Sequence, residues 1–339
     1  MTRITSYNIL AGGYDFQRNG TRRVDQLVRI IRSTQPDVVG LVEAIHPKVT
    51  QKPNVAEEIA ERLGMQMVPG GEPRSLYDYQ PMLLTRLPIV YSKIHPRPEI
   101  SGKSLIEVCV EEENGQHLTV FLTHLSASFN KGWAGSHIRQ RELQNVIRLM
   151  APLREQGKPH LLMGDFNTVS PGDPLKASFL LRYVVELDER NRNKTIIDGN
   201  PHLNAVVPPR LRFLKPVLRT IARSDALCTL FDAAAYYYVP RGCIRLLHEA
   251  GYIDCYRRSH PHEWGFTCPS AAPAGRIDYI FASPDLAERL EGCSEVTEGE
   301  GLRGSDASDH LAVSATFGLG VQPIAPSPEL DNELDNATI

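Results

Sequence analysis

Apolar and polar residues alternate along the first part of the chain in a way that predicts a strand, a helix and a second strand. Residues 3–10 form a short apolar and β-branched run followed by two glycines, which predicts a strand and a turn. Residues 24–44 pass from helical to strand periodicity. The apolar positions of the helical part recur at spacings of three and four, which predicts a core-facing side made of Val24, Leu27, Val28 and Ile31. The chain therefore begins as a β-α-β unit.

Further apolar runs predict strands through the rest of the chain. They cover residues 81–90, 103–112, 117–125, 159–167, 276–283 and 310–317. The turn around Glu113, Asn114 and Gly115 predicts that the second and third of these runs form a hairpin. A helix is expected at about residues 137–150. Crossover units and antiparallel pairs thus occur together, and polar residues gather where apolar strands end, which is where α/β proteins place their chemistry.

Residues 176–242 interrupt this pattern, and we interpret them as a partly helical insertion. A basic stripe recurs within it at spacings of three and four, and it consists of Arg212, Lys215, Arg219 and Arg223. Leu211, Leu214, Leu218, Ile221 and Ala222 share another face, and Pro216 suits the first turn of a helix. Three interpretations stay open: the solvated face of a helix lying on the domain, a lid that presents positive charge to an anionic substrate, or an element that binds a membrane surface.

The distribution of charge along the chain bears on which partners the protein can bind. Residues 319–339 hold four of the 40 acidic residues and none of the 37 basic ones, so the remaining 37 basic and 36 acidic residues leave a body of formal charge +1. We expect this acidic, proline-bearing tail to be disordered. A body so close to neutral gives no support to nucleic acid as a partner, although a local basic patch would suffice for it.

The cysteines and the absence of membrane signals suggest a cytoplasmic location, and we separately expect a monomer. The six cysteines show no C-x-x-C spacing, and we interpret them as reduced thiols. The chain has no run of about 18 apolar residues, and its first residues lack the pattern of a signal peptide.

Polar residues at the predicted strand ends form an ordered set with the chemistry of phosphoester hydrolysis. Such a reaction requires carboxylates for a hard divalent cation, a base or water-orienting group, and donors to the phosphate oxygens. Any one of these residues alone is weak evidence, because an Asn or Glu at a strand end is usually a turn or solvated residue. Together they supply every requirement: Asn8, Glu43, His124, Asp165, Asn167, Asp278, Asp309 and His310.

The segments around these residues resemble the successive signatures of the endonuclease/exonuclease/phosphatase superfamily, which includes the relatives of deoxyribonuclease I, exonuclease III and the neutral sphingomyelinases. The matching segments are SYNIL, LVEA, THL, GDFN, RIDYIF and SDH, and the resemblance covers about residues 1–175 and 243–318. It implies an α/β fold, namely a four-layer α/β/β/α sandwich of two packed mixed sheets flanked by helices. We accordingly expect residues 1–318 to form one catalytic domain.

The resemblance also implies roles for individual residues. Glu43 matches the family's metal ligand and Asn8 the asparagine beside it, which implies Mg²⁺ or Mn²⁺. Asp309 matches a possible second metal ligand or hydrogen-bond partner, and whether one or two ions bind stays open.

For catalysis, Asp165 and Asn167 match the pair that orients the attacking water and contacts the phosphate. His124 matches a donor to a phosphate oxygen. Asp278 matches the aspartate that orients His310, which makes His310 the preferred general base, with Asp165 as the alternative.

The chain departs from the family pattern in three places. Gln80 and Pro81 stand where many relatives have glycine or asparagine. Leu10 occupies the position of an acidic residue in abasic-site nucleases, which makes that activity less expected. The carboxylate that supports His124 in nuclease relatives could be Asp78, Glu99 or Glu107.

These observations predict a metal-dependent phosphoester hydrolase acting on a phosphoester substrate. We rank phosphodiesterase above phosphomonoesterase, and both above a nuclease. The alternative from another class is a catalytically silent binding module on the same fold. A calcineurin-like enzyme is excluded, because its D-x-H and GNH motifs do not occur in the sequence.

Overall fold

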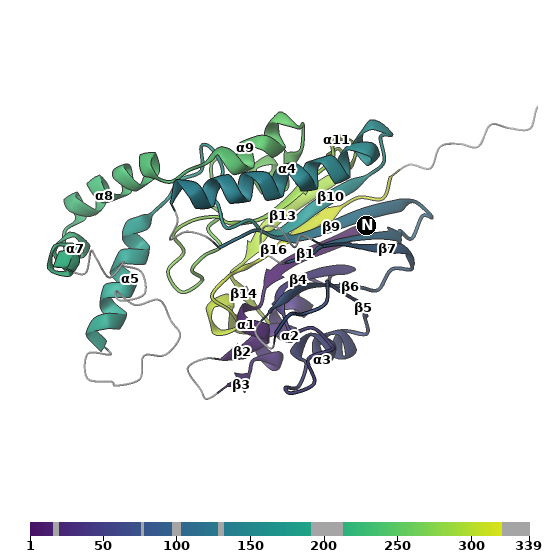
Figure 1. The fold of residues 1–339 in the computed structure, drawn as a ribbon, viewed down its shortest axis with the longest axis horizontal. Coiled ribbons are helices and arrows are strands. Elements are labelled where there is room, and N and C mark those ends of the chain that lie inside the picture. The colour runs from purple at the N-terminus through teal and green to yellow at the C-terminus, as the bar shows by residue number, and fades with distance from the viewer. Residues whose placement is uncertain (16–19, 76–77, 97–102, 128–131, 191–212, 321–339) are drawn as a thin grey trace, which may run out of the picture.

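The computed structural model describes residues 1–15, 20–75, 78–96, 103–127, 132–190 and 213–320. Within these residues, two mixed six-stranded sheets form the centre of the protein (Figure 1). In the first sheet β1 runs parallel to β4, and the other neighbours are antiparallel. Its strands in spatial order are β13 (Leu290–Val296), β16 (Ala312–Phe317), β1 (Thr2–Asn8), β4 (Val38–Ala44), β6 (Gln80–Thr85) and β5 (Gln66–Pro69).

The second sheet contains the strands that carry most of the predicted catalytic residues. Here β9 and β10 are parallel and the remaining neighbours are antiparallel. Its order is β11 (Ile253–Asp254), β12 (Asp278–Ala282), β10 (His160–Asp165), β9 (His117–His124), β8 (Leu105–Glu111) and β7 (Ile89–His95). Two short ribbons pair β2 (Tyr14–Asp15) with β3 (Thr21–Arg22) and β14 (Glu298–Gly299) with β15 (Leu302–Arg303).

Apolar side chains on both faces of each sheet create the layers. One cluster, including Ile4, Val42 and Met163, lies between the two sheets. Helices α2 (Val24–Ser33) and α3 (Val55–Leu63) cover the outer face of the first sheet. Helices α4 (Trp133–Glu155) and α9 (Gly242–Glu249) cover that of the second. The predicted four-layer α/β/β/α sandwich is therefore confirmed, because strands buried on both faces must be covered by helices.

Shorter elements connect these layers. They are α1 (Leu10–Gly13), α10 (Cys255–Ser259), α11 (Pro284–Ala287) and the 3₁₀ turn η3 (Gly304–Asp306). The predicted core side of the first long helix is correct, since all four of its apolar positions are buried in α2. The predicted hairpin is β8–β9, and the expected helix at 137–150 extends over the whole of α4.

In the described part of the predicted insertion, residues 176–190 and 213–242, three helices project from one end of the sandwich (Figure 1): α5 (Ala177–Arg190), α7 (Lys215–Ala222) and α8 (Asp225–Tyr238). They pack on one another around a small core formed by Leu181, Val184, Val185 and Ala222. Pro216 lies in the first turn of α7, as its position in the sequence predicts.

Two of the four residues of the basic stripe form ion pairs within the insertion. Arg219 pairs with Asp188 and Arg223 with Glu189, both acids of α5. Arg212 lies outside the described residues. These contacts favour the interpretation of the stripe as part of helix packing, because both arginines already have a carboxylate partner.

The cysteines and the search for membrane-spanning helices can also be compared with the sequence expectations. All six cysteines are described and carry free thiols. Among the described residues, no helix is both long and apolar enough to cross a membrane. Of the acidic tail, only the first two residues belong to the described part of the chain.

Candidate active site

Strand register gathers the predicted site residues at one end of the sandwich. In the second sheet Asp165 at the end of β10 lies opposite His124 on β9 and Asp278 on β12. In the first sheet Asn8 and Glu43 lie at the ends of the parallel strands β1 and β4. The two sets meet across the interface between the sheets, where the Asn8 side-chain amide donates to Asp165 Oδ2 at 3.0 Å.

Gly164 allows β10 to approach β9 closely just before Asp165. Its φ of +138° favours glycine, and a Cβ there would lie 1.9 Å from the carbonyl oxygen of Thr123. Any larger residue would push the two strands apart where they carry Asp165 and His124. The Gly-Asp pair of the GDFN segment is therefore a packing requirement as well as a chemical one.

A β-bulge turns Glu43 toward the site. Between Leu41 and Ala44, β4 has one more residue than its partner β6, and Glu43 takes a φ of +62°. Val42 belongs to the core between the sheets and Ala44 to the outer core, so the extra residue lies between the two faces. Glu43 Oε2 accepts a bond from the Ala11 amide at 2.9 Å, and Oε1 lies 3.9 Å from His124 Nε2. Bulges often re-aim a side chain at an active site.

Asp165 is the centre of the cluster and is almost completely buried. Its Oδ1 accepts a bond from the Asn167 amide at 2.8 Å, and Oδ2 lies 3.6 Å from His124 Nε2. Burial, followed by the nearby charge of Asp278, raises the pKa of Asp165 to about 7. The carboxyl is thus held where it can exchange a proton near neutral pH.

Asn167 closes the turn that follows β10. Its φ of +50° is in the left-handed region, which asparagine tolerates better than most residues. Its side-chain amide donates to the Leu125 carbonyl at 2.9 Å, which ties the turn to the end of β9. The D-x-N spacing therefore produces a rigid turn directly beside the reactive carboxyl.

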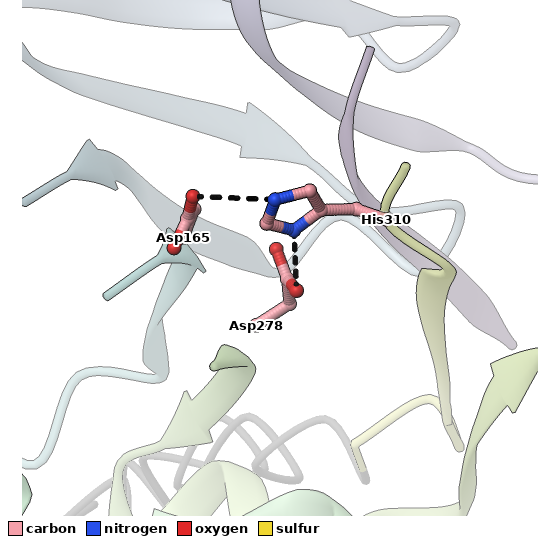
Figure 2. A group of neighbouring side chains, drawn as sticks. All are labelled: Asp165, Asp278 and His310. Atoms are coloured by element: carbon pink, nitrogen blue, oxygen red, sulfur yellow. Dashed lines mark hydrogen bonds and ion pairs between the residues drawn. The ribbon is translucent and has the colours of Figure 1, made fainter. Parts of the chain in front are cut away.

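His310 is held between two carboxyls, as Figure 2 shows. Its Nδ1 lies 2.9 Å from Asp278 Oδ2, and its Nε2 lies 4.0 Å from Asp165 Oδ2. Burial disfavours the protonated ring, but the charges of Asp278 and neighbouring groups outweigh it, so the pKa of His310 is raised well above its usual value. Asp278 therefore fixes both the orientation and the basicity of this ring.

Lys103 is a member of the cluster that the sequence analysis missed. It lies two positions before the start of β8, and the antiparallel pairing of β8 with β9 brings it beside His124. Its Nζ lies 2.6 Å from His124 Nδ1 and 2.9 Å from Nε2. The signal in the sequence was a lone lysine at a strand start, which gains meaning only once that strand is paired with the one carrying His124.

Asp309 lies in the loop between η3 and β16. Ser308 donates to the Asn8 carbonyl at 2.7 Å and lies 3.4 Å from Asp309 Oδ1. Burial is the main cause that raises the pKa of Asp309, and the charge of Glu43 adds to it. The buried Arg23 donates to the carbonyls of Ala307 and Ile9, so it ties this loop to the end of β1.

The positions that depart from the family pattern have other roles. Gln80 accepts bonds from Ser104, and the Leu10 amide donates to Asn8 Oδ1. Glu107 is bonded to Tyr91 and His95, and Asp78 to the Arg74 amide. Glu99 lies outside the described residues. Among the described residues, the carboxylates within 4 Å of His124 are those of Glu43 and Asp165, whereas Asp78 and Glu107 bond to other partners.

The donor set fits a hard divalent cation. Carboxylates from four strands or loops converge here. The charge of Asp278 raises the pKa of Asp165, and the charge of Glu43 raises the pKa of Asp309. Ligand atoms of Asp165, Asp278 and His310 all lie within 4.8 Å of one another. A cluster of mutually repelling oxygen donors is the environment that Mg²⁺ or Mn²⁺ neutralises.

Comparison with known proteins gives the sequence a family. The model of the endonuclease/exonuclease/phosphatase family matches residues 5–310. No curated protein matches the sequence at a significant level.

Solved structures share the fold at low sequence identity. An AP endonuclease from Archaeoglobus fulgidus superposes with a TM-score of 0.57 and 18% identity over 94% of this chain and 100% of its own. The 3′ phosphatase NExo from Neisseria, bound to a product DNA hairpin, has a TM-score of 0.57 and 16% identity over 94% and 100%. TDP2 from D. rerio, complexed with a single-strand DNA product, has a TM-score of 0.55 and 16% identity over 94% of this chain and 99% of its own.

Proposed function

Because this chain belongs to the endonuclease/exonuclease/phosphatase family, we propose that it is a divalent-cation-dependent phosphodiesterase. Membership supports phosphoester hydrolysis as the kind of reaction. The observation that carries the proposal is the convergence of Asp165, His310 and Glu43 from both sheets into one buried cluster. A binding module would have no evident need to bury mutually repelling acids together.

We assign Glu43 and Asn8 as the residues that hold Mg²⁺ or Mn²⁺, with Asp309 as a further ligand or hydrogen-bond partner. The bound cation would supply positive charge to a phosphate oxygen as negative charge builds on it. The backbone amide of Ala11 orients Glu43 from one side, which leaves its second oxygen free to face the cluster.

The remaining residues position water and substrate. Asp278 holds His310 in the tautomer that leaves Nε2 to accept a proton from the attacking water. Asp165 lies next to that atom and is the alternative base, consistent with its raised pKa. His124 and Asn167, with Lys103 beside His124, would donate to the phosphate oxygens.

The substrate ranking places phosphodiesters ahead of phosphomonoesters. Neighbouring structures include proteins bound to DNA products, which supports including nucleic acids among the phosphodiesters to be tested. We propose a monomer acting in the cytoplasm, and the six free thiols fit a reducing compartment.

Metal dependence can be tested through Glu43. Replacing it with Gln removes one ligand charge, and we expect turnover of a generic phosphodiester to fall by about 10²- to 10³-fold at limiting Mg²⁺. Glu61→Gln, at an exposed position on α3, is the matched control and should leave turnover unchanged. Equal activity of the wild type and Glu43→Gln across a metal titration would refute the assignment.

Substrate class can be tested by a metal-supplemented screen of a small phosphodiester, a phosphomonoester and an oligonucleotide. Asp165→Ala serves as the control for contaminating activity. If the wild-type protein hydrolyses none of these substrates with any divalent cation, the silent binding module becomes the better interpretation.

A further inference from the structure

A cleft lies between the insertion and the loop that supports His310 and Asp309. It has a volume of about 810 Å³, which falls within the usual size range of small-molecule sites. One wall is α5, and the other includes residues 262–266 and 271–273. The insertion therefore contributes one wall of this concave surface through α5.

The cleft is lined mainly by rings. Trp264 stacks on Phe266 with the ring centroids 5.2 Å apart and the planes at 27°. Phe179 of α5 lies 6.1 Å from Trp264 at a tilt of 58°. Phe266 is buried, whereas Trp264 remains 47% exposed and Phe179 38% exposed. A half-exposed tryptophan supported from below by a buried ring is the arrangement on which a further flat ring stacks.

Charged groups around the rings indicate what kind of ring fits. Glu186, Glu263 and Glu295 line the cleft together with Arg182, and carboxylates accept bonds from ring N–H and amino groups. Lys176 Nζ lies over the Trp264 ring, 5.6 Å from its centroid, and pairs with Asp232 at 3.6 Å, so it adds a positive charge at the edge of the cleft.

The cleft is connected to the active site through backbone hydrogen bonds. Leu311 lines the cleft directly after His310, and its amide donates to the Thr267 carbonyl at 2.8 Å. Thr267 Oγ1 accepts a bond from the Asp278 amide at 3.3 Å. The Ser270 amide donates to the Asp309 carbonyl at 2.7 Å. The same loop thus forms the cleft wall and bonds to two of the site residues, Asp278 and Asp309.

We propose that this cleft is a subsite for a nucleobase of the substrate, so that the phosphodiester cleaved at the active site is part of a nucleotide or a single strand. The inference rests on the proposed hydrolase function and specifies its substrate class. The stacking surface is assembled from the insertion and the core loop together, which assigns the insertion a part in substrate selection.

Binding can be measured without turnover, because the sequence contains two tryptophans. In a Trp133→Phe, Asp165→Ala variant, Trp264 is the only one left. We expect saturable quenching of its fluorescence by a four-residue oligothymidylate and none by a base-free deoxyribose phosphate oligomer of equal length. In a Trp264→Phe, Asp165→Ala variant, the fluorescence of the exposed Trp133 should not respond to either.

Kinetics provide the second measurement. Trp264→Ala should raise KM for the oligonucleotide by roughly 5- to 150-fold, the range measured for loss of one stacking aromatic. KM for a small base-free phosphodiester should stay within about twofold, and Trp264→Phe should retain part of the oligonucleotide affinity. Phe179→Ala tests the opposite wall, and a thermal melt shows whether each variant is folded.

Several results would overturn the subsite. Equal quenching by both oligomers would mean that the cleft contacts the backbone, and quenching by a dispersed short-chain phospholipid but not by oligothymidylate would identify a groove for a lipid tail. Normal substrate turnover without quenching of Trp264 fluorescence by oligothymidylate refutes the nucleobase subsite but leaves the hydrolase proposal intact. Quenching with no turnover of any substrate by a folded protein with Asp165 intact refutes the hydrolase proposal alone.

Discussion

The catalytic end of the sandwich and the helical insertion differ in how their polar and apolar side chains are used. At the catalytic end, buried polar groups are bonded across the two sheets, as Asn8 is to Asp165. In the insertion several large apolar side chains are exposed: Phe213 by 73%, Leu230 by 67% and Tyr237 by 83%. Its charged groups, such as Arg223 and Glu189, pair at the surface.

This difference indicates that the catalytic end must be rigid, whereas the insertion is free to vary. The site is determined by two sheets, several loops and a bulge, so small shifts in it are opposed by many contacts. The insertion depends on a small core of its own, so we expect it to open at a lower free energy than the sandwich. A rigid core with a separable attachment is a common way to combine one chemistry with a particular substrate.

The sharpest way to break the catalytic end is Asp165→Asn. We expect kcat to fall by about 10³-fold or more, because the carboxylate next to His310 is lost. In EDTA the same variant should be more stable than the wild type at pH 8, by on the order of 1–3 kcal/mol.

The sign of that stability effect follows from the direction of the pKa shift. The folded-state pKa of Asp165, about 7, lies above its unfolded value of 3.8, so ionisation costs folding free energy. The cost grows as the pH rises from about 4 to about 7 and is constant above that. Thermal melts at pH 4 and pH 8 check this, and an equal gain at both pH values would contradict it.

Gly164→Ala tests the close approach of β10 to β9. A Cβ would lie 1.9 Å from the Thr123 carbonyl oxygen, and we expect a loss of about 3 kcal/mol or more in the free energy of unfolding. Gly157→Ala is the matched control, since its φ is also positive but no atom lies within 4 Å of the added Cβ. It should cost about 1–2 kcal/mol. Similar losses in urea titrations of the two variants would show that contact with β9 is unimportant.

Asp278→Asn sharpens the assignment of the base. Asp278 raises the pKa of His310, so its loss should lower that pKa and shift the acidic limb of the kcat profile to lower pH. We expect kcat to fall by about 10- to 100-fold with little change in the Mg²⁺ concentration required. A large increase in that concentration would instead make Asp278 a metal ligand.

The smallest effect is expected in the insertion, from Arg223→Ala. The pair with Glu189 is exposed, with 69% of the arginine side chain accessible, so its loss should change the free energy of unfolding by less than about 0.5 kcal/mol. Turnover of a compact phosphodiester should be unchanged. A clear loss of turnover would show that the basic stripe acts on the substrate after all.

The sequence by itself predicted the strands that carry or adjoin the eight candidate site residues. The structure brings all eight to one end of the sandwich, although their roles stay proposals. This was possible because the site segments follow apolar runs whose periodicity is local, and because strand ends of packed sheets meet at one edge.

Only the tertiary structure decided which residues act together beyond those segments. The bulge that turns Glu43, the approach of Lys103 to His124 and the pairing of Arg219 with Asp188 all depend on the register of strands or the packing of helices. Phe179 and Trp264 lie 85 positions apart in the sequence and share one cleft. Hydrophobic periodicity reports which face of an element is buried, but it carries no information about which distant side chains that face will meet.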